Sequence, residues 1–79
     1  MNQDLREELA VLVHDQWARW MRHLFGLSTH NEDGTVTIPA ASVERWQRQI
    51  ATDYADLSDA GKNSDRAEAN RVLNILEKN

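Results

Sequence analysis

An uninterrupted amphipathic stretch from Leu5 to Phe25 constrains the fold of this chain more than any other feature. Its apolar residues recur at steps of three and four, and neither glycine nor proline breaks the run. Arg19, Arg22 and His23 stand near its end and acidic residues in its first turn, which suits the dipole of a helix. The stretch therefore predicts one long helix, with Gly26 just past its C-terminus.

The middle of the chain predicts an extended arm and a second helix. Turn-forming residues from Ser28 to Gly34 precede the β-branched run Thr35 to Ile38, which favours extended backbone. We expect this arm either to lie on the core or to pair with another copy of the chain. Pro39 suits the first turn of a helix that runs from about Ala40 to Ala51.

The C-terminal part predicts a third helix. Ser58 is a good N-cap, and an apolar face follows as far as about Glu77. Gly61 and the polar residues after it weaken the first two turns. We therefore expect an all-α fold: a single three-helix domain spanning residues 1–79, with a short extended arm between helices 1 and 2 and the helices packed around one core.

The length of the chain limits how it can be stabilised. A domain of 79 residues buries only about 60 to 65% of its unfolded surface. There is no cysteine, and the spacing of His14, His23 and His30 does not suit a closed zinc site, so we expect neither a metal nor a cofactor. Stability must come from dense helix packing or from self-association, and a homo-oligomer therefore remains an open alternative.

Composition narrows the location and the partners. The N-terminus lacks the pattern of a signal peptide, and no stretch is long and apolar enough to cross a bilayer, so we expect a cytoplasmic protein with no membrane partner. The net charge of −4 argues against general affinity for nucleic acid, although it permits a local basic patch.

Two polar residues at the edge of the apolar faces are candidates for a binding site. His14 follows the apolar Val13, and Arg66 lies in the polar first half of the third helix. His14 is either a structural hydrogen-bonding partner or a ligand-binding group. Arg66 either forms an ion pair, for example with Asp15 or Asp56, or holds a phosphate or carboxylate. Neither is accompanied by an activated nucleophile, so we do not expect an enzyme.

Arginines and tryptophans supply two further candidate features. Arg19 and Arg22 share a face of the first helix, and Arg45 and Arg48 share a face of the second, so neighbouring helices would combine the pairs into a basic patch. The alternative is two solvated helix edges with salt bridges. The tryptophans fall on apolar stripes and are expected in the core, although one at the rim could stack on a base or anchor a partner protein. They are Trp17, Trp20 and Trp46.

Two segments read together, Leu12 to Trp17 and Tyr54 to Ala69, resemble the RyR domain, a small helical module named after the ryanodine receptor repeats. The pattern is a His-acidic pair followed by an aromatic residue, and later Tyr, Leu, Lys, Asp or Asn, Arg and a small residue. The matching positions are His14, Asp15, Trp17, Tyr54, Leu57, Lys62, Asp65, Arg66 and Ala69. The section from Asn31 to Gln49 looks like the short proteins encoded in bacteriophages and prophages.

The resemblance implies a function. RyR domains of bacterial conflict systems are proposed to sense nucleotide-derived signals, which implies a non-catalytic phage-type module acting in the host cytoplasm. Its ligand would be an anionic nucleotide-derived molecule, and sequestering it would silence a host signal. The implied ligand-binding residues are His14, Trp17, Tyr54, Lys62 and Arg66. The alternative is a protein-binding adaptor or inhibitor that acts on a host protein through the tryptophans and arginines.

Overall fold

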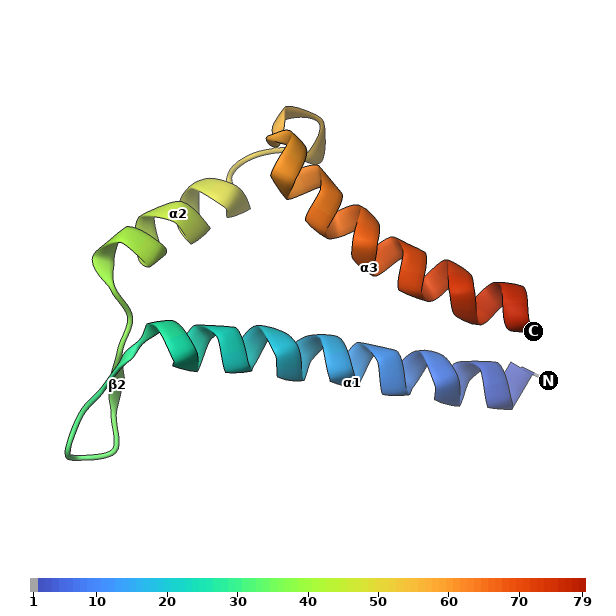
Figure 1. Cartoon of the computed structure of the whole chain (residues 1–79), viewed down its shortest axis with the longest axis horizontal. Coiled ribbons are helices and arrows are strands. Elements are labelled where there is room, and N and C mark those ends of the chain that lie inside the picture. Colours follow the sequence, from blue (N-terminus) through green and yellow to red (C-terminus); the bar gives the residue numbers. More distant parts are fainter. Residues whose placement is uncertain (1) are drawn as a thin grey trace.

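The structure is a computed structural model that describes residues 2–79, with side chains from Asp4 onward. Its elements, in chain order, are α1 (Asn2–Leu27), β1 (Thr29–His30), β2 (Val36–Thr37), α2 (Ala40–Ile50), the 3-10 helix η1 (Tyr54–Asp56) and α3 (Asp59–Lys78). Figure 1 shows the three long helices as the sides of a flat triangle, in which the N-terminal end of α1 meets the C-terminal end of α3. The mainly helical fold expected from the sequence is confirmed, and a small two-stranded sheet is added to it.

The first helix is slightly longer than the apolar periodicity predicted. It continues through Gly26, so the expectation that this glycine lies past the helix end was wrong. Ser28 terminates the helix instead: its hydroxyl donates to the carbonyl of Leu24 at 2.7 Å, and its backbone N–H donates to the carbonyl of Phe25 at 3.3 Å. These bonds satisfy carbonyls that a helix end would otherwise leave open.

The predicted extended arm pairs within its own chain. Thr37 and Val36 of β2 lie opposite Thr29 and His30 of β1 in an antiparallel hairpin. The sequence did not reveal β1, because two polar residues inside a run of turn formers carry no strand periodicity. The hairpin projects from one corner of the triangle (Figure 1) and directs the chain from α1 into α2.

The tip of the hairpin is held by side chains. The carboxylate of Asp33 accepts from the hydroxyl of Thr35 at 2.6 Å and from its backbone N–H at 3.0 Å. These hydrogen bonds lower the pKa of Asp33. Gly34 between them has φ of 90°, a conformation that a side chain disfavours.

Replacement of this glycine is expected to weaken the hairpin. Gly34→Ala should cost about 1 to 2 kcal/mol, because an L-residue is strained at positive φ. Gly26→Ala is the control, since its added methyl group meets open space on a helix and should be neutral or slightly stabilising. Urea denaturation of both variants at one protein concentration checks this. An equal effect of the two changes would contradict the assigned turn.

The second and third helices begin and end close to the predicted residues. The carbonyl of Pro39 accepts the N–H groups of Ser42 and Val43 at the start of α2. Ser58 is the N-cap of α3 as expected, with its hydroxyl accepting from the N–H of Gly61 at 3.1 Å. The third helix runs unbroken through Gly61, because the cap supplies a hydrogen-bond acceptor for the backbone N–H of Gly61 in the weak first turn.

The single core expected from the sequence is absent. No hydrophobic residue among residues 4–79 is buried, and Val13, Trp17 and Leu73 are exposed by 63%, 59% and 50%. The radius of gyration is 16.2 Å, whereas a compact chain of this length has about 12 Å. The molecule is also only 16 Å deep along its shortest axis. The helices therefore form one open layer rather than a closed bundle.

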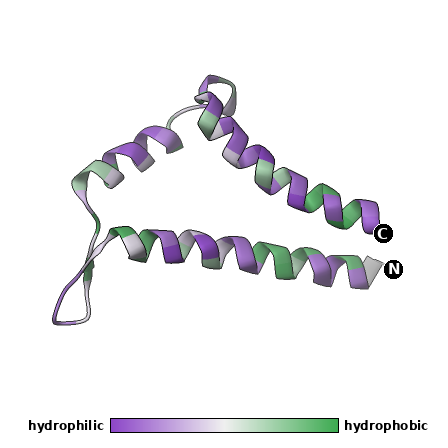
Figure 2. Cartoon of the chain, viewed as in Figure 1, coloured by the Kyte–Doolittle hydropathy of each residue, from purple (hydrophilic) through white to green (hydrophobic). Residues whose placement is uncertain are grey.

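The layer is held together where α1 and α3 run antiparallel. Arg19 of α1 and Glu68 of α3 form a two-pronged ion pair, with Nη1 to Oε1 at 2.5 Å and Nη2 to Oε2 at 3.1 Å. Near the ends of the two helices, the Asn79 side chain donates to the carboxylate of Glu8 at 3.2 Å. Figure 2 shows apolar segments along α1 and in the C-terminal half of α3, where the two helices approach each other.

The ion pair between Arg19 and Glu68 makes stability depend on pH. The hydrogen bond from Arg19 lowers the pKa of Glu68 below its ordinary value of 4.5. A carboxyl with a lowered folded-state pKa stabilises the fold above its unfolded pKa, and this contribution is lost as the pH falls through the folded value. We expect Glu68→Gln to lower the melting temperature modestly at pH 7 and to flatten its fall at acidic pH. Melting curves between pH 7 and pH 3 check this, with Glu77→Gln as the exposed control.

Candidate functional site

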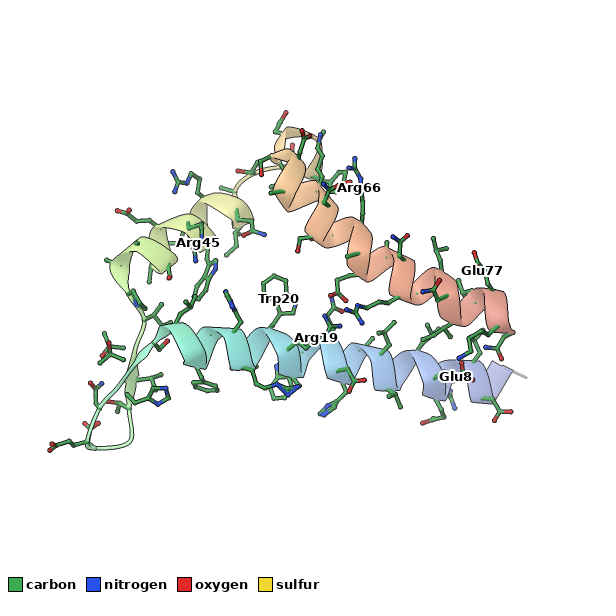
Figure 3. The ribbon with its side chains drawn as sticks, viewed as in Figure 1. Glu8, Arg19, Trp20, Arg45, Arg66 and Glu77 are labelled. Atoms are coloured by element: carbon green, nitrogen blue, oxygen red, sulfur yellow. The ribbon has the colours of Figure 1, made fainter. Side chains whose placement is uncertain are left out.

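A cavity lies inside the triangle, between the C-terminal half of α1, the end of α2 and the start of α3. Its volume is about 610 Å³, within the range of about 300 to 1,000 Å³ typical of small-molecule sites. Figure 3 shows Trp20 rising from α1 toward the space between α2 and α3. The aromatic and ionisable residues of its lining are Trp20, His23, Arg45, Trp46, Arg48 and Asp56.

Helical spacing pairs some of these side chains along each helix. Trp20 and His23 are three residues apart on α1, so they share a face, and Arg45 and Arg48 share a face of α2 in the same way. The C-terminal end of α2 is fixed by the hydroxyl of Thr52, which donates to the carbonyl of Arg48 at 2.6 Å. The contact between the His23 and Trp46 rings shows that α2 lies opposite this part of α1.

Aromatic and cationic groups contact one another in this cavity. The guanidinium carbon of Arg45 lies 5.9 Å from the ring centroid of Trp46, a cation–π distance. The rings of His23 and Trp46 are tilted by 58° with their centroids 6.5 Å apart. Within residues 4–79, neither Arg45 nor Arg48 has a carboxylate within ion-pair distance. Asp56 is the acidic residue of the lining, so the arginines give the cavity a positive balance.

A smaller cavity of about 290 Å³ adjoins the first and shares Trp20, His23 and Ser64 with it. Its remaining lining residues are Arg19 and Glu68, whose charges are already paired. Arg19 therefore serves the contact between helices and contributes little to the positive charge that a ligand would meet. Arg19 thus follows the salt-bridge alternative considered for the arginines, whereas Arg45 and Arg48 line the larger cavity.

The five residues implied by the RyR resemblance do not converge on one pocket. The rings of His14 and Trp17 lie side by side on α1, tilted by 37° with their centroids 5.9 Å apart. The ammonium of Lys62 lies 5.9 Å from the ring centroid of Tyr54. Arg66 donates to the side-chain carbonyl of Asn63 at 3.0 Å, instead of the ion pair with Asp15 or Asp56 that we considered. None of the five belongs to the lining of either cavity.

Helix geometry explains why His14 and Arg66 stay apart. Arg19 faces α3, and at 100° per residue His14 lies about 140° around α1 from it, on the side away from α3. Glu68 faces α1, and Arg66 lies about 160° around α3 from it, on the outer side of that helix (Figure 3). The two side chains therefore point in opposite directions.

The other sequence candidates divide between the cavity and the surface. Arg22 is exposed and, unlike Arg45 and Arg48, does not line either cavity. The four arginines thus form no single patch. The tryptophans are not core residues: Trp20 is 46% exposed, Trp46 is half-buried, and both line the cavity, which is the rim position considered as an alternative.

Sequence reasoning missed His23 and Asp56 as members of the site. His23 lies three residues after Trp20, so its place beside a rim tryptophan was readable from the helical period. Asp56 comes from η1, whose position relative to α2 depends on the connection between α2 and α3. No local pattern encodes that position.

Comparisons with known proteins add no family: no family model, curated protein or solved structure matches the chain. Within residues 2–79, no helix combines the length and the apolar character that spanning a membrane requires. That part of the chain also holds no group of three or more His, Cys, Asp and Glu side chains placed to bind a metal ion.

Proposed function

We propose that this chain is a non-catalytic binding module that captures a small anionic molecule with a planar ring, of the nucleotide class, in the cavity between α1, α2 and α3. The observation that carries the proposal is the lining of that cavity, in which two tryptophans and two arginines without ion-pair partners meet. These are the groups that recognise the two halves of a nucleotide.

The tryptophans are suited to the ring. Trp20 is 46% exposed and Trp46 is half-buried, so each retains surface that a planar molecule can cover. Stacking of a base on an aromatic side chain is worth about 1 to 3 kcal/mol and tolerates different bases, because every base has a π-face. The cavity therefore favours a planar ring without requiring one particular base.

The arginines are suited to the anion. Each guanidinium presents up to five N–H donors in a rigid fork that matches phosphate geometry. Arg45 and Arg48 share a face of α2 and border the same space, so both can contact one phosphate group. Asp56 on the other side of the cavity would repel an anion, which favours a phosphate placed near α2.

The biological role in the proposal comes from the resemblance to RyR domains and to short phage proteins. A module that holds a nucleotide-derived signal without converting it would lower the free concentration of that signal in a host cell. The proposal keeps the ligand class implied by the resemblance and moves the site from His14 and Arg66 to the cavity.

Titration calorimetry tests the proposal with three kinds of compound: cyclic and linear nucleotides, the matching nucleosides, and ribose 5-phosphate. We expect nucleotides to bind, and compounds without the phosphate or the base to bind at least about fivefold more weakly, because each part contributes about 1 kcal/mol or more. The nucleotide should be recovered unchanged. Absence of heat with every nucleotide, or equal affinity for ribose 5-phosphate, would contradict the proposed function.

A further inference from the structure

An apolar surface lies on one side of the layer formed by α1 and α3. We call it the apolar face, and it comprises four residues of each helix: Ala10, Val13, Trp17, Leu24, Ala69, Val72, Leu73 and Leu76. Within each helix these residues recur at steps of three, four or seven, or stand side by side, so they form one stripe. Six of the eight are larger than alanine, and five of those six are among the exposed large hydrophobic residues.

The two stripes point to the same side of the layer. On α1 the side turned toward α3 is the half-buried line of Leu5, Leu9, Leu12, Gln16 and Arg19, and the stripe lies about 80° to 140° past the centre of that line in the direction of increasing residue number. On α3 the stripe lies about 40° to 140° past Glu68, which faces α1, in the same direction. Antiparallel helices turn in opposite senses when both are viewed from one end. Similar rotations therefore bring the two stripes onto one common surface.

The opposite side of the layer is mainly polar. The same helical geometry places Asp15 and Arg22 of α1 and Asn74 and Lys78 of α3 there. The layer formed by α1 and α3 is thus amphipathic: one side is apolar and the other is mainly polar. Protein domains bury such a surface against another layer of secondary structure.

The solvent-accessible area of the chain indicates how much surface a partner could bury. The chain exposes 6480 Å², whereas a compact monomer of 9.1 kDa exposes about 4,900 Å². The excess of about 1,600 Å² belongs to the whole open chain, and burying half of it would supply the roughly 800 Å² per partner of a standard stable interface. Two copies therefore have the surplus that a stable dimer requires.

We propose that two copies of this chain stack through the apolar face, so that each supplies the second layer of the other. A second copy is favoured because none of the eight residues is charged, so the face can pair with itself without like-charge repulsion. A twofold axis in the plane of the face repeats the same surface on both partners. This inference does not depend on the proposed ligand, because none of these eight residues lines the cavity.

Sedimentation equilibrium with a matched pair of variants tests the dimer. Val13 and Val11 are exposed by 63% and 60% on the same helix, but Val11 lies about 160° around from Val13 and outside the apolar face. The wild type should have twice the monomer mass of 9.1 kDa. Val13→Glu should weaken the dimer at least about 100-fold, because it buries an unpaired charge in the interface, and Val11→Glu should leave it unchanged.

Circular dichroism distinguishes loss of the dimer from a general effect of the added charge. Val13→Glu should lose helix on dilution at concentrations where Val11→Glu keeps it, since the apolar face would lack its cover. A wild-type mass of 9.1 kDa at every concentration up to about 200 µM would overturn the proposal. Equal effects of the two variants on mass and helix content would overturn it as well.

Discussion

Replacing both cavity arginines, in Arg45→Ala/Arg48→Ala, is expected to lower the affinity for a nucleoside monophosphate by about 100-fold, because each charged hydrogen bond to phosphate contributes about 1.5 kcal/mol. Both residues are exposed, so the fold should tolerate the change. Titration calorimetry measures the loss. The remaining affinity should respond less to salt than that of the wild type, since fewer charges contact the ligand.

The matched control removes the same total charge elsewhere. Arg22→Ala/Arg66→Ala changes the net charge equally, and neither residue lines the cavity. We expect its affinity to stay within about twofold of the wild type. Asp56→Asn should have the opposite effect on affinity. It removes the negative charge of the cavity lining and should strengthen nucleotide binding. Loss of affinity in the Arg22 and Arg66 variant alone would place the ligand outside the cavity.

Dilution of the wild-type protein by 100-fold is expected to lower its melting temperature by about 5 to 10 °C. Mass action changes the free energy of a dimer by about 2.7 kcal/mol over that range, and a dimer of this size loses about 2 to 4 °C for each kcal/mol. The effect is large because the single chain has no buried hydrophobic residue among residues 4–79 to hold it folded. Melting curves followed by circular dichroism at about 1 and 100 µM measure it.

A charge added on the apolar face and a charge added on the opposite side of the layer should affect the melting temperature differently. Val11→Glu should keep the full shift with concentration, because Val11 lies outside the apolar face. Val13→Glu should melt at a lower temperature than Val11→Glu at both concentrations, because its dimer is weaker. A wild-type melting temperature independent of concentration would mean that one chain folds alone despite its open layer.

The sequence predicted the helices well because local signals define them. The apolar period and the uninterrupted run from Leu5 to Phe25 indicated α1. Ser58 indicated the start of α3, because its hydroxyl accepts a hydrogen bond from Gly61, only three residues later in the chain. These interactions are complete within one or two turns. A single sequence therefore contains what is needed to locate them.

The core and the site could not be predicted with the same success. A helical period shows which face is apolar but does not show whether the same chain covers that face, so Val13 and Trp17 were expected in a core and are exposed. The site depends on the angles between helices, which no short motif encodes. Trp20, Trp46, Arg45 and Arg48 were recognised as candidates individually, but their meeting in one cavity follows from the position of α2.

Nuclear magnetic resonance of the indole N–H groups tests the location of the binding site most directly, because Trp17, Trp20 and Trp46 give one signal each. Saturating the protein with a nucleoside monophosphate should shift the signals of Trp20 and Trp46, which line the cavity, and leave that of Trp17 in place. Movement of the Trp17 signal with Trp20 and Trp46 unchanged would contradict the account and place the ligand beside His14.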